Sequence, residues 1–233
     1  MERIKEQGFE SKVLGIFTWI DCACRPLTTD ELTEILTVSF KEDPDKSVPL
    51  NWQEWLDMCE SLVVITEDKT VLFAHRTVSE FLRSQYGSHV YSSIWIAKAC
   101  LRYLGLDVFS EVGVDEESLK GRTKKHMFSG YAAEFWGNHI KDAEYDVGVQ
   151  NLVYEVFADE SRRTAIRQME QYVKSGFEEA NIEPLLLVMA EKGLSHLCQK
   201  ILSEIQAETR YYLMLLEADH KYGRTAERAE CHE

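Results

Sequence analysis

The chain has 233 residues, of which 45% are hydrophobic and 28% charged, so it is long enough to bury a core in one large domain or in about two to three small ones. Its formal net charge of −14 gives a negative field that repels phosphate backbones and anionic membranes. The sequence therefore predicts neither nucleic acid nor membrane as a partner, and the longest uncharged apolar run, residues 184–190, is far shorter than the roughly 20 residues that span a bilayer.

The six cysteines lie mostly within apolar helical patterns and do not form a spaced disulfide framework. No apolar segment of the kind that directs secretion follows Met1. We therefore expect reduced thiols and a cytoplasmic location. The cysteines are Cys22, Cys24, Cys59, Cys100, Cys198 and Cys231.

The first 88 residues show the pattern of three helices, a hairpin and a fourth helix. Apolar residues between positions 13 and 20 follow helical spacing, and Pro26 ends that helix. Thr28 or Thr29 can cap a second helix, whose buried apolar residues lie between positions 32 and 36. Residues 41–49 hold two prolines and several charges, which predicts an exposed loop.

A third short helix and a hairpin follow. Trp52 and Trp55 begin a run with apolar residues at i, i+3, i+4 and i+7, which is typical of an amphipathic helix. The β-branched run at 62–66 is expected to pair with 71–75 across a turn at 67–70. Three helices and a hairpin make up the plan of a winged helix.

The stretch between the hairpin and the next helix is the most informative part of the chain. It reads Phe73-Ala74-His75-Arg76-Thr77-Val78-Ser79-Glu80-Phe81-Leu82. This stretch resembles the F-x-H-x-[ST]-V-x-E-F-L signature of the winged-helix domain that follows the NACHT ATPase in fungal NLR-like (STAND) signalling proteins. Residues 25–28 and 59–64 resemble the same family in the same order, so the resemblance covers most of residues 9–88.

Beyond Gly87 the pattern is wholly helical. Apolar residues between positions 94 and 104 predict one helix, whereas residues 107–125 are polar and predict a loop. Tyr131-Ala132-Ala133-Glu134-Phe135-Trp136 then opens a further helix. A Y-A-A-x-x-W helix stands between the winged helix and a repeat array in the fungal proteins, so it extends the resemblance. Amphipathic patterns over 152–157 and 166–173 complete a packed helical linker.

The C-terminal region resembles the beginning of ankyrin repeats. Residues 184–198 are similar to the first helix, glycine turn and second helix of one repeat, and residues 222–226 are similar to the start of the next. The positions that would align, Pro184 and Thr225, are 41 residues apart, where about 33 is normal, and Glu227 stands where an apolar residue is expected. A plain helical hairpin also explains this spacing.

His75 carries the sharpest functional hypothesis. In animal NLR proteins a histidine in a similar F-x-H-x-x-x-[QE]-[FE]-[FL] segment reaches the β-phosphate of bound ADP. The resemblance implies this nucleotide-sensing role for His75, toward a NACHT domain that this sequence does not contain, and a phosphate would favour the charged imidazolium. The alternative is that His75 hydrogen-bonds the start of the helix at 77–83 and packs under Phe73.

The residue types needed for catalysis or for holding a cofactor do not occur together. The phosphate-binding G-x-x-x-x-G-K-[ST] loop is missing, and residues 121–125 are expected to be a solvated loop, with nuclear import or anion binding as the alternative. The winged-helix family that the signature resembles carries a label that mentions a GPI inositol-deacylase, a lipid hydrolase that would need a serine nucleophile. Ser79 and Ser129 lack the glycines of a G-x-S-x-G elbow, so neither is expected to be such a nucleophile. Cys22 and Cys24 cannot share a helix face as metal ligands and are better explained as small buried residues. We expect no enzymatic activity, no metal and no cofactor.

The third helix is predicted to face protein. In DNA-binding winged helices this helix presents Arg, Lys, Asn or Gln to base edges, whereas residues 51–60 hold three acids and no base. Trp52 and Trp55 are expected to be core anchors, and an exposed face of these two residues is a candidate for docking on a partner domain. Arg76 and Glu80, four residues apart on the next helix, are expected to form an ion pair and to contribute to the same surface. Trp95 and Trp136 are expected in the core.

The sequence thus predicts a mainly α-helical protein with a small β-hairpin, a winged helix followed by a helical linker and an ankyrin-like helical array. The expected parts are an N-terminal extension at 1–8, the winged helix at 9–88, the linker at 89–178 and incomplete repeats at 179–233. The expected function is that of a non-enzymatic regulatory module of an NLR-like signalling protein, whose winged helix docks on a NACHT nucleotide-binding domain in cis or in trans. The alternatives are a free-standing adaptor or decoy that acts on NACHT proteins in trans, and a DNA-binding regulator.

Overall fold

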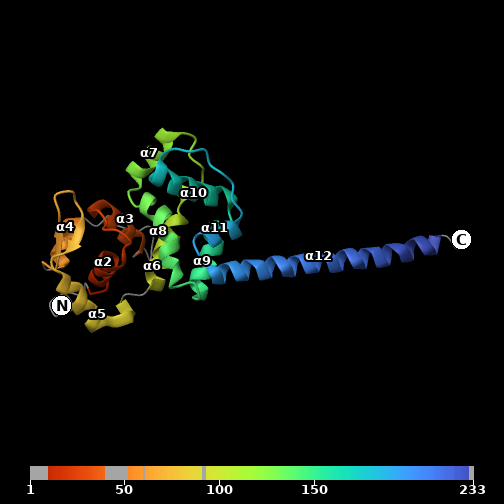
Figure 1. Cartoon of the computed structure of the whole chain (residues 1–233), viewed down its shortest axis with the longest axis horizontal. Helices are drawn as coiled ribbons and strands as arrows, with labels where there is room; N and C mark the ends of the chain where they lie inside the picture. Colours follow the sequence, from red (N-terminus) through yellow and green to blue (C-terminus); the bar gives the residue numbers. More distant parts are fainter. Residues whose placement is uncertain (1–9, 40–51, 60, 91–92, 231–233) are drawn as a thin grey trace. The chain divides into compact units, whose positions relative to one another are not determined.

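The computed structural model describes residues 10–39, 52–59, 61–90 and 93–230, and for some of these, among them Trp52, Trp55 and residues 215–230, it describes the backbone alone. The chain divides into two compact units, Met1–Leu185 and Leu186–Glu233. The ranges expected for the winged helix and for the helical linker both fall within the first unit. The described part is mainly α-helical with a small hairpin, which confirms the expected fold class (Figure 1).

The winged helix is built around its first described helix. Helices α2, α3 and α4 are followed by an antiparallel hairpin of β1 and β2, in which Val64 lies opposite Leu72, and then by α5. Helix α2 packs on α3, α4, α5 and β2, so it lies at the centre of this domain. The bounds are α2 Glu10–Cys22, α3 Thr29–Ser39, α4 Trp52–Met58, β1 Val63–Ile65, β2 Val71–Phe73 and α5 Arg76–Val90.

The residues before α3 add a short edge to the hairpin. The Val71 N–H donates to the Leu27 carbonyl oxygen (2.9 Å), and the Thr29 N–H donates to the Lys69 carbonyl oxygen (2.9 Å). Lys69 closes the turn between the strands with a φ of 64°, in the left-handed region. The hairpin expected across residues 67–70 is therefore confirmed, and it is fixed to the start of α3.

Helix α3 begins with a capping box. The Glu31 N–H donates to Thr28 Oγ1 (3.3 Å), and the Thr28 N–H donates to Glu31 Oε2 (2.8 Å). Of the two capping residues that the sequence allows, the structure selects Thr28. A cap of this kind contributes about 1 kcal/mol to helix stability.

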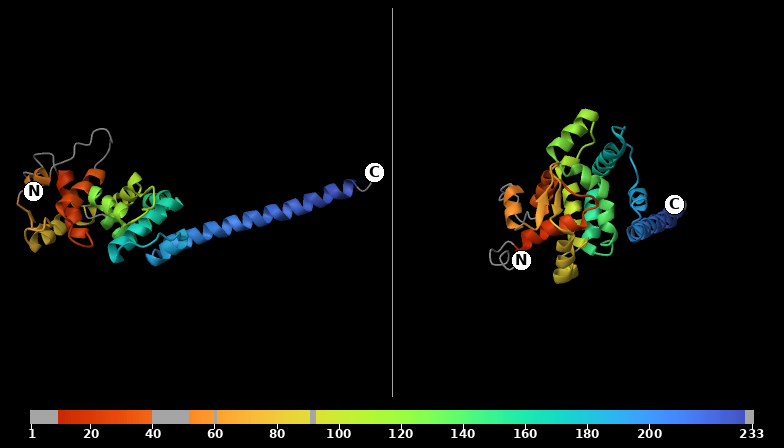
Figure 2. Two further views of the ribbon diagram at one scale, coloured as in Figure 1. Left: turned by 90° about the horizontal axis from the view of Figure 1, so that it is seen from above. Right: turned by 60° about the vertical axis from the view of Figure 1, so that its left-hand side comes forward.

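The helices after the winged helix pack into one group. Helix α6 packs on α8 and α9, α8 packs on α7 and α10, and α3 of the winged helix packs on α6. Figure 2 shows these helices, coloured yellow-green to cyan, beside the red and orange winged helix. Their bounds are α6 Ser93–Leu104, α8 Ser129–Lys141, α9 Val147–Phe157 and α10 Glu160–Ser175.

The prediction of a loop over residues 107–125 is wrong. The segment contains a short 3-10 helix, η2 (Asp107–Phe109), and a helix, α7 (Glu116–Lys125). Asp115 and Ser118 form a capping box, in which Asp115 Oδ1 accepts from the Ser118 N–H (2.8 Å). Acids lie in the first turn of α7 and bases in its last turn, which suits the helix dipole. Residues 121–125 are therefore helical. Apolar periodicity does not reveal α7, because one buried residue, Leu119, is not enough to form a periodic pattern.

The described part of the second unit is a short helix joined by a turn to a long helix. Helix α11 (Leu185–Glu191) is joined to α12 (Ser195–Glu230) by a turn in which Gly193 has a φ of 71°. This matches the helix, glycine turn and helix expected over 184–198. Residues 222–226, expected to begin a second repeat, lie inside α12 (Figure 1), because a glycine within a long helical run costs only about 1 kcal/mol. The ankyrin-like array is therefore not confirmed.

Most of the exposed apolar residues described in the second unit lie on α12, and one, Leu187, lies on α11. None of the described helices, this long one included, combines the length and the apolar character needed to cross a membrane. Among the side chains of the unit described up to residue 214, the buried ones are Val188, Met189, Leu194, Leu197 and Ile201. The exposed apolar ones are Leu187, Leu202, Ile205, Tyr211, Tyr212, Leu213 and Met214.

Candidate docking face and helical junction

The start of α5 holds the histidine that the sequence singles out. His75 Nδ1 accepts a hydrogen bond from the Thr77 N–H (3.2 Å) and lies 2.8 Å from Thr77 Oγ1. Because Nδ1 accepts, the neutral imidazole carries its proton on Nε2. The hydrogen bond from Thr77 makes His75 a cap of α5. Because His75 is also exposed, its Nε2 is available as a donor to another group. The hydrogen bond to the helix start is the alternative role considered above, and the phosphate contact stays a prediction.

One face of α5 is open. Arg76 Nη2 lies 2.8 Å from Glu80 Oε1, and the two side chains are 83% and 59% exposed. The ion pair expected from the spacing is therefore present at the surface. Phe81, next to Glu80 in the chain, is 51% exposed, whereas Leu82 is fully buried and anchors the opposite side of the helix. We call Arg76, Thr77, Glu80, Phe81 and Ser84 the α5 face, because the i, i+4 spacing places them together and all five are exposed.

Helix α4 adds acidic side chains to the surface of the winged helix. Gln53, Glu54 and Asp57 are exposed. The side chains of Trp52 and Trp55 lie outside the described residues, so their part in docking stays a prediction. The described polar residues of α4 include acids and no base, which is a poor match to a DNA backbone.

The serines and cysteines that were considered as nucleophiles or metal ligands have the following surroundings in the structure. The Ser79 hydroxyl donates to Asp21, and Ser129 is fully buried. The described residues contain no group of three or more side chains suited to hold a metal ion. Cys22 is half-buried and Cys24 is exposed beyond the end of α2, so the expectation that both are buried is wrong for Cys24. The chain leaves α2 after Cys22, and the Cys24 N–H donates to Tyr131 of α8.

The comparison with known families decides the identity of the first domain. Residues 2–94 match the family described as "GPI inositol-deacylase, winged helix domain". This segment is a winged-helix domain of that family. The winged-helix family expected from the signature at 73–82 is thereby confirmed for this segment, and the observed helices and hairpin agree with it, whereas the NACHT and NLR-like context stays a prediction. No curated protein and no solved structure matches the chain.

The winged-helix domain buries a tryptophan under the helices that follow it. Trp19 of α2 is fully buried, and its ring meets three rings of the α8 region edge-on. The ring centres lie 5.5 Å from Phe128, 6.3 Å from Tyr131 and 5.9 Å from His139. Trp95 of α6 lies 6.3 Å away on a further side. Trp19 of the winged-helix domain is therefore the centre of an aromatic cluster whose other rings come from α6, from α8 and from the residue that precedes α8.

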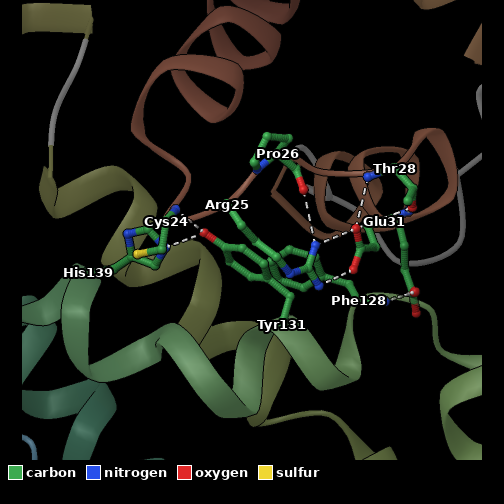
Figure 3. A network of polar contacts seen from close by, with 9 residues as sticks. Cys24, Arg25, Pro26, Thr28, Glu31, Phe128, Tyr131 and His139 are labelled. Carbon is green, nitrogen blue, oxygen red and sulfur yellow. Dashed lines mark hydrogen bonds and ion pairs between the residues drawn. The ribbon is translucent and has the colours of Figure 1, made fainter. Parts of the chain in front are cut away.

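A chain of hydrogen bonds crosses the same contact (Figure 3). The Cys24 N–H donates to the Tyr131 hydroxyl (2.8 Å), whose oxygen lies at hydrogen-bond distance from His139 Nε2 (2.9 Å). His139 is only 8% exposed, and desolvation lowers its pKa to about 4, so the imidazole is neutral at pH 7. Burial also raises the pKa of the Tyr131 hydroxyl, which stays protonated and able to donate.

An arginine of the winged-helix domain bridges α3 and α8. Arg25 Nη2 lies 2.6 Å from Glu31 Oε1, and Nη1 lies 3.0 Å from Glu31 Oε2. The guanidinium carbon also lies 5.1 Å from the centre of the Tyr131 ring, in a cation–π contact (Figure 3). One cation thus holds the capping carboxylate of α3 and an aromatic ring of α8.

Glu34 of α3 reaches the start of α8. Its Oε2 accepts from the N–H of Phe128, the residue that precedes α8 (2.8 Å). Its Oε1 accepts from the Tyr103 hydroxyl of α6 (2.8 Å) and lies 3.5 Å from His126 Nδ1. A carboxylate at a helix N-terminus is favoured by the helix dipole, so Glu34 acts as a cap supplied from another part of the fold.

Sequence reasoning missed most of this junction. Trp19, Glu34 and His139 were not singled out, and Tyr131 was noted only as the beginning of a helix. Trp19 lies three residues after Ile16, on the buried face of α2, so helical spacing could have placed it in the core. Trp136 is fully buried, as expected.

Proposed function

We propose that this chain is a non-enzymatic regulatory and protein-interaction module, whose winged-helix domain docks on a nucleotide-binding domain of the NACHT class. The observation that supports the proposal is the α5 face, where Phe81 is half exposed beside the Arg76–Glu80 pair. Aromatic and arginine side chains are enriched at protein interfaces, where they act as anchors. This face lies in the segment whose signature resembles NLR-like proteins.

Charge favours a protein partner over DNA. The chain has a net charge of −14, and the exposed polar residues of α4 are acidic or neutral. A winged helix that reads DNA needs bases on this helix and along the phosphates it crosses. The DNA-binding alternative predicts salt-dependent binding to duplex DNA, and a flat titration at low salt would remove it.

The proposed mechanism is a change in the position of the winged-helix domain between a closed and an open state. By the resemblance, His75 would contact the β-phosphate of ADP in the closed state, and its exposed position at the start of α5 is compatible with this role. The equilibrium would shift when a ligand contacts one state better than the other. Loss of His75 would then weaken ADP retention in a protein that carries both domains.

The α5 face can be tested by binding. A purified, ADP-loaded NACHT domain is titrated with the whole chain and with Phe81→Ala, which we expect to weaken binding by about tenfold or more because an anchor residue is lost. Val114→Ala is the matched control, because Val114 is 85% exposed and lies outside the winged-helix domain. Equal affinities of Phe81→Ala and the control would show that the α5 face is not the docking surface.

Action in cis and action in trans predict different native sizes. An antibody raised against residues 9–88 would detect a polypeptide far above 27.0 kDa if the module belongs to a larger ATPase. A band near 27.0 kDa would favour the adaptor or decoy, which uses the same surface on separate NACHT proteins.

A further inference from the structure

We infer that the winged-helix domain and helices α6–α10 form one cooperative unit, held together by a latch, so that the winged helix does not open or turn on its own. The inference concerns the chain alone and does not rest on the proposed docking. The latch consists of Trp19, Cys24, Arg25 and Glu34 on the winged-helix side and of Phe128 and Tyr131 on the α8 side.

The apolar part of the latch completes a core. The family match ends at residue 94, whereas the rings that meet Trp19 edge-on from α8 and its start belong to residues 128–139. The winged-helix domain alone would therefore expose a tryptophan that the whole chain buries completely. Because burial of a large aromatic ring is among the strongest apolar contributions to a fold, separation of the two parts is unfavourable.

The polar part of the latch is reciprocal. Helix α8 supplies the acceptor for an amide of the winged-helix domain, since the Cys24 N–H donates to the Tyr131 hydroxyl. The winged-helix domain supplies the acceptor for an amide of α8, since the Phe128 N–H donates to Glu34. Separation would leave polar groups on both sides without these partners, which is costly for groups that are partly buried.

The latch joins segments that are far apart in the sequence. Its two amide hydrogen bonds connect residues separated by 107 and by 94 positions. They form only when α2, α3 and α8 are all in place, so neither part keeps its complete set of contacts if the other unfolds. Contacts of this kind make neighbouring elements open as one unit.

Two buried cysteines allow the unit to be measured in the unmodified chain. Cys59, between α4 and β1, is 1% exposed and reports on the winged helix, and Cys100 of α6 is fully buried and reports on the following helices. The chain is pulsed with iodoacetamide over a denaturant series, and each cysteine is quantified by peptide mass spectrometry. We expect the two thiols to follow one curve, with labelling rates that agree within about twofold. Labelling of Cys59 at clearly lower denaturant than Cys100 would overturn the inference.

Conservative variants test whether the latch carries the coupling. Trp19→Ala would lower the stability of both parts at once, so the test uses Tyr131→Phe combined with Glu34→Gln, which remove the acceptor of the Cys24 N–H and the negative charge at the start of α8. We expect labelling of Cys59 to rise by about tenfold relative to Cys100, because the winged helix can then open alone. The matched control combines Tyr172→Phe with Glu80→Gln, outside the latch, and should keep both thiols on one curve. If both thiols shift equally in the latch variant, these contacts add only general stability and the latch is not what couples the two parts.

Discussion

Two arginine–glutamate pairs of the winged-helix domain lie in opposite surroundings. Arg25 and Glu31 approach to 2.6 Å at the junction, where the glutamate side chain is 9% exposed. Arg76 and Glu80 approach to 2.8 Å on the α5 face, where both side chains are more than half exposed. The distances are nearly equal, so distance does not tell which pair matters to the fold. Burial and further partners do, because a solvated pair gains little over its hydrated ions.

The comparison extends to the two faces as a whole. At the junction every polar contact described above also touches a buried ring or a helix start, so a change there is felt in the fold. On the α5 face the ion pair and Phe81 are free to exchange water for a partner. The winged-helix domain thus has one surface that is buried against the helices that follow it and one that is exposed to solvent.

The largest expected effect is that of Trp19→Ala. Removal of this fully buried ring should lower the free energy of unfolding by about 3–5 kcal/mol, because the cluster cannot close over the cavity. Chemical denaturation followed by circular dichroism measures it. Phe81→Ala, on the open face, is the control and should cost less than about 1 kcal/mol. Similar losses in the two variants would remove the distinction between the faces.

The buried histidine should make stability depend on pH. Its pKa is lowered from 6.5 to about 4 in the folded chain, so the unfolded chain binds the proton first as the pH falls. The free energy of unfolding therefore decreases from about pH 6.5 down to about pH 4 and this contribution then levels off, for a total on the order of 3 kcal/mol.

His139→Gln isolates this contribution from that of the carboxylates. The variant lacks the titrating imidazole, so its stability should fall less steeply between pH 7 and pH 4, and the gap between the two proteins should narrow. Denaturation midpoints at a series of pH values measure the gap. Parallel profiles would mean that His139 does not titrate with the lowered pKa.

Arg25→Ala should have an intermediate effect. It leaves Glu31 nearly buried without its cation and removes the contact with the Tyr131 ring. We expect a loss of about 2 kcal/mol in the free energy of unfolding, less than for a fully buried pair because the Arg25 side chain is 39% exposed. Urea denaturation would test this, and a loss below about 0.5 kcal/mol would place the pair with ordinary surface pairs.

Arg76→Ala should have the smallest effect on the fold. The Arg76 side chain is 83% exposed, so the free energy of unfolding should change by less than about 0.5 kcal/mol. The same denaturation series measures it beside Arg25→Ala. A loss as large as that of Arg25→Ala would show that the α5 face also belongs to the structural core.

Local patterns predicted what depends on local contacts. The hairpin, the cap at Thr28 and the burial of Trp136 follow from alternation, capping chemistry and helical spacing. Helix α7 was missed because its stability comes from a capping box and charge placement and not from an apolar face. The two amide hydrogen bonds of the latch join residues separated by 94 and by 107 positions, and no periodicity in a single sequence relates such residues.

The dependence of Trp19 on α8 has a consequence during synthesis. Phe128, the first residue of the α8 region to place a ring against Trp19, is translated 109 residues after Trp19. At about 5–20 residues per second, a ribosome needs roughly 5–20 s to make that stretch. For that interval the emerging winged helix exposes an indole ring that the finished protein hides, and a chaperone that recognises aromatic side chains has a defined time in which to bind it.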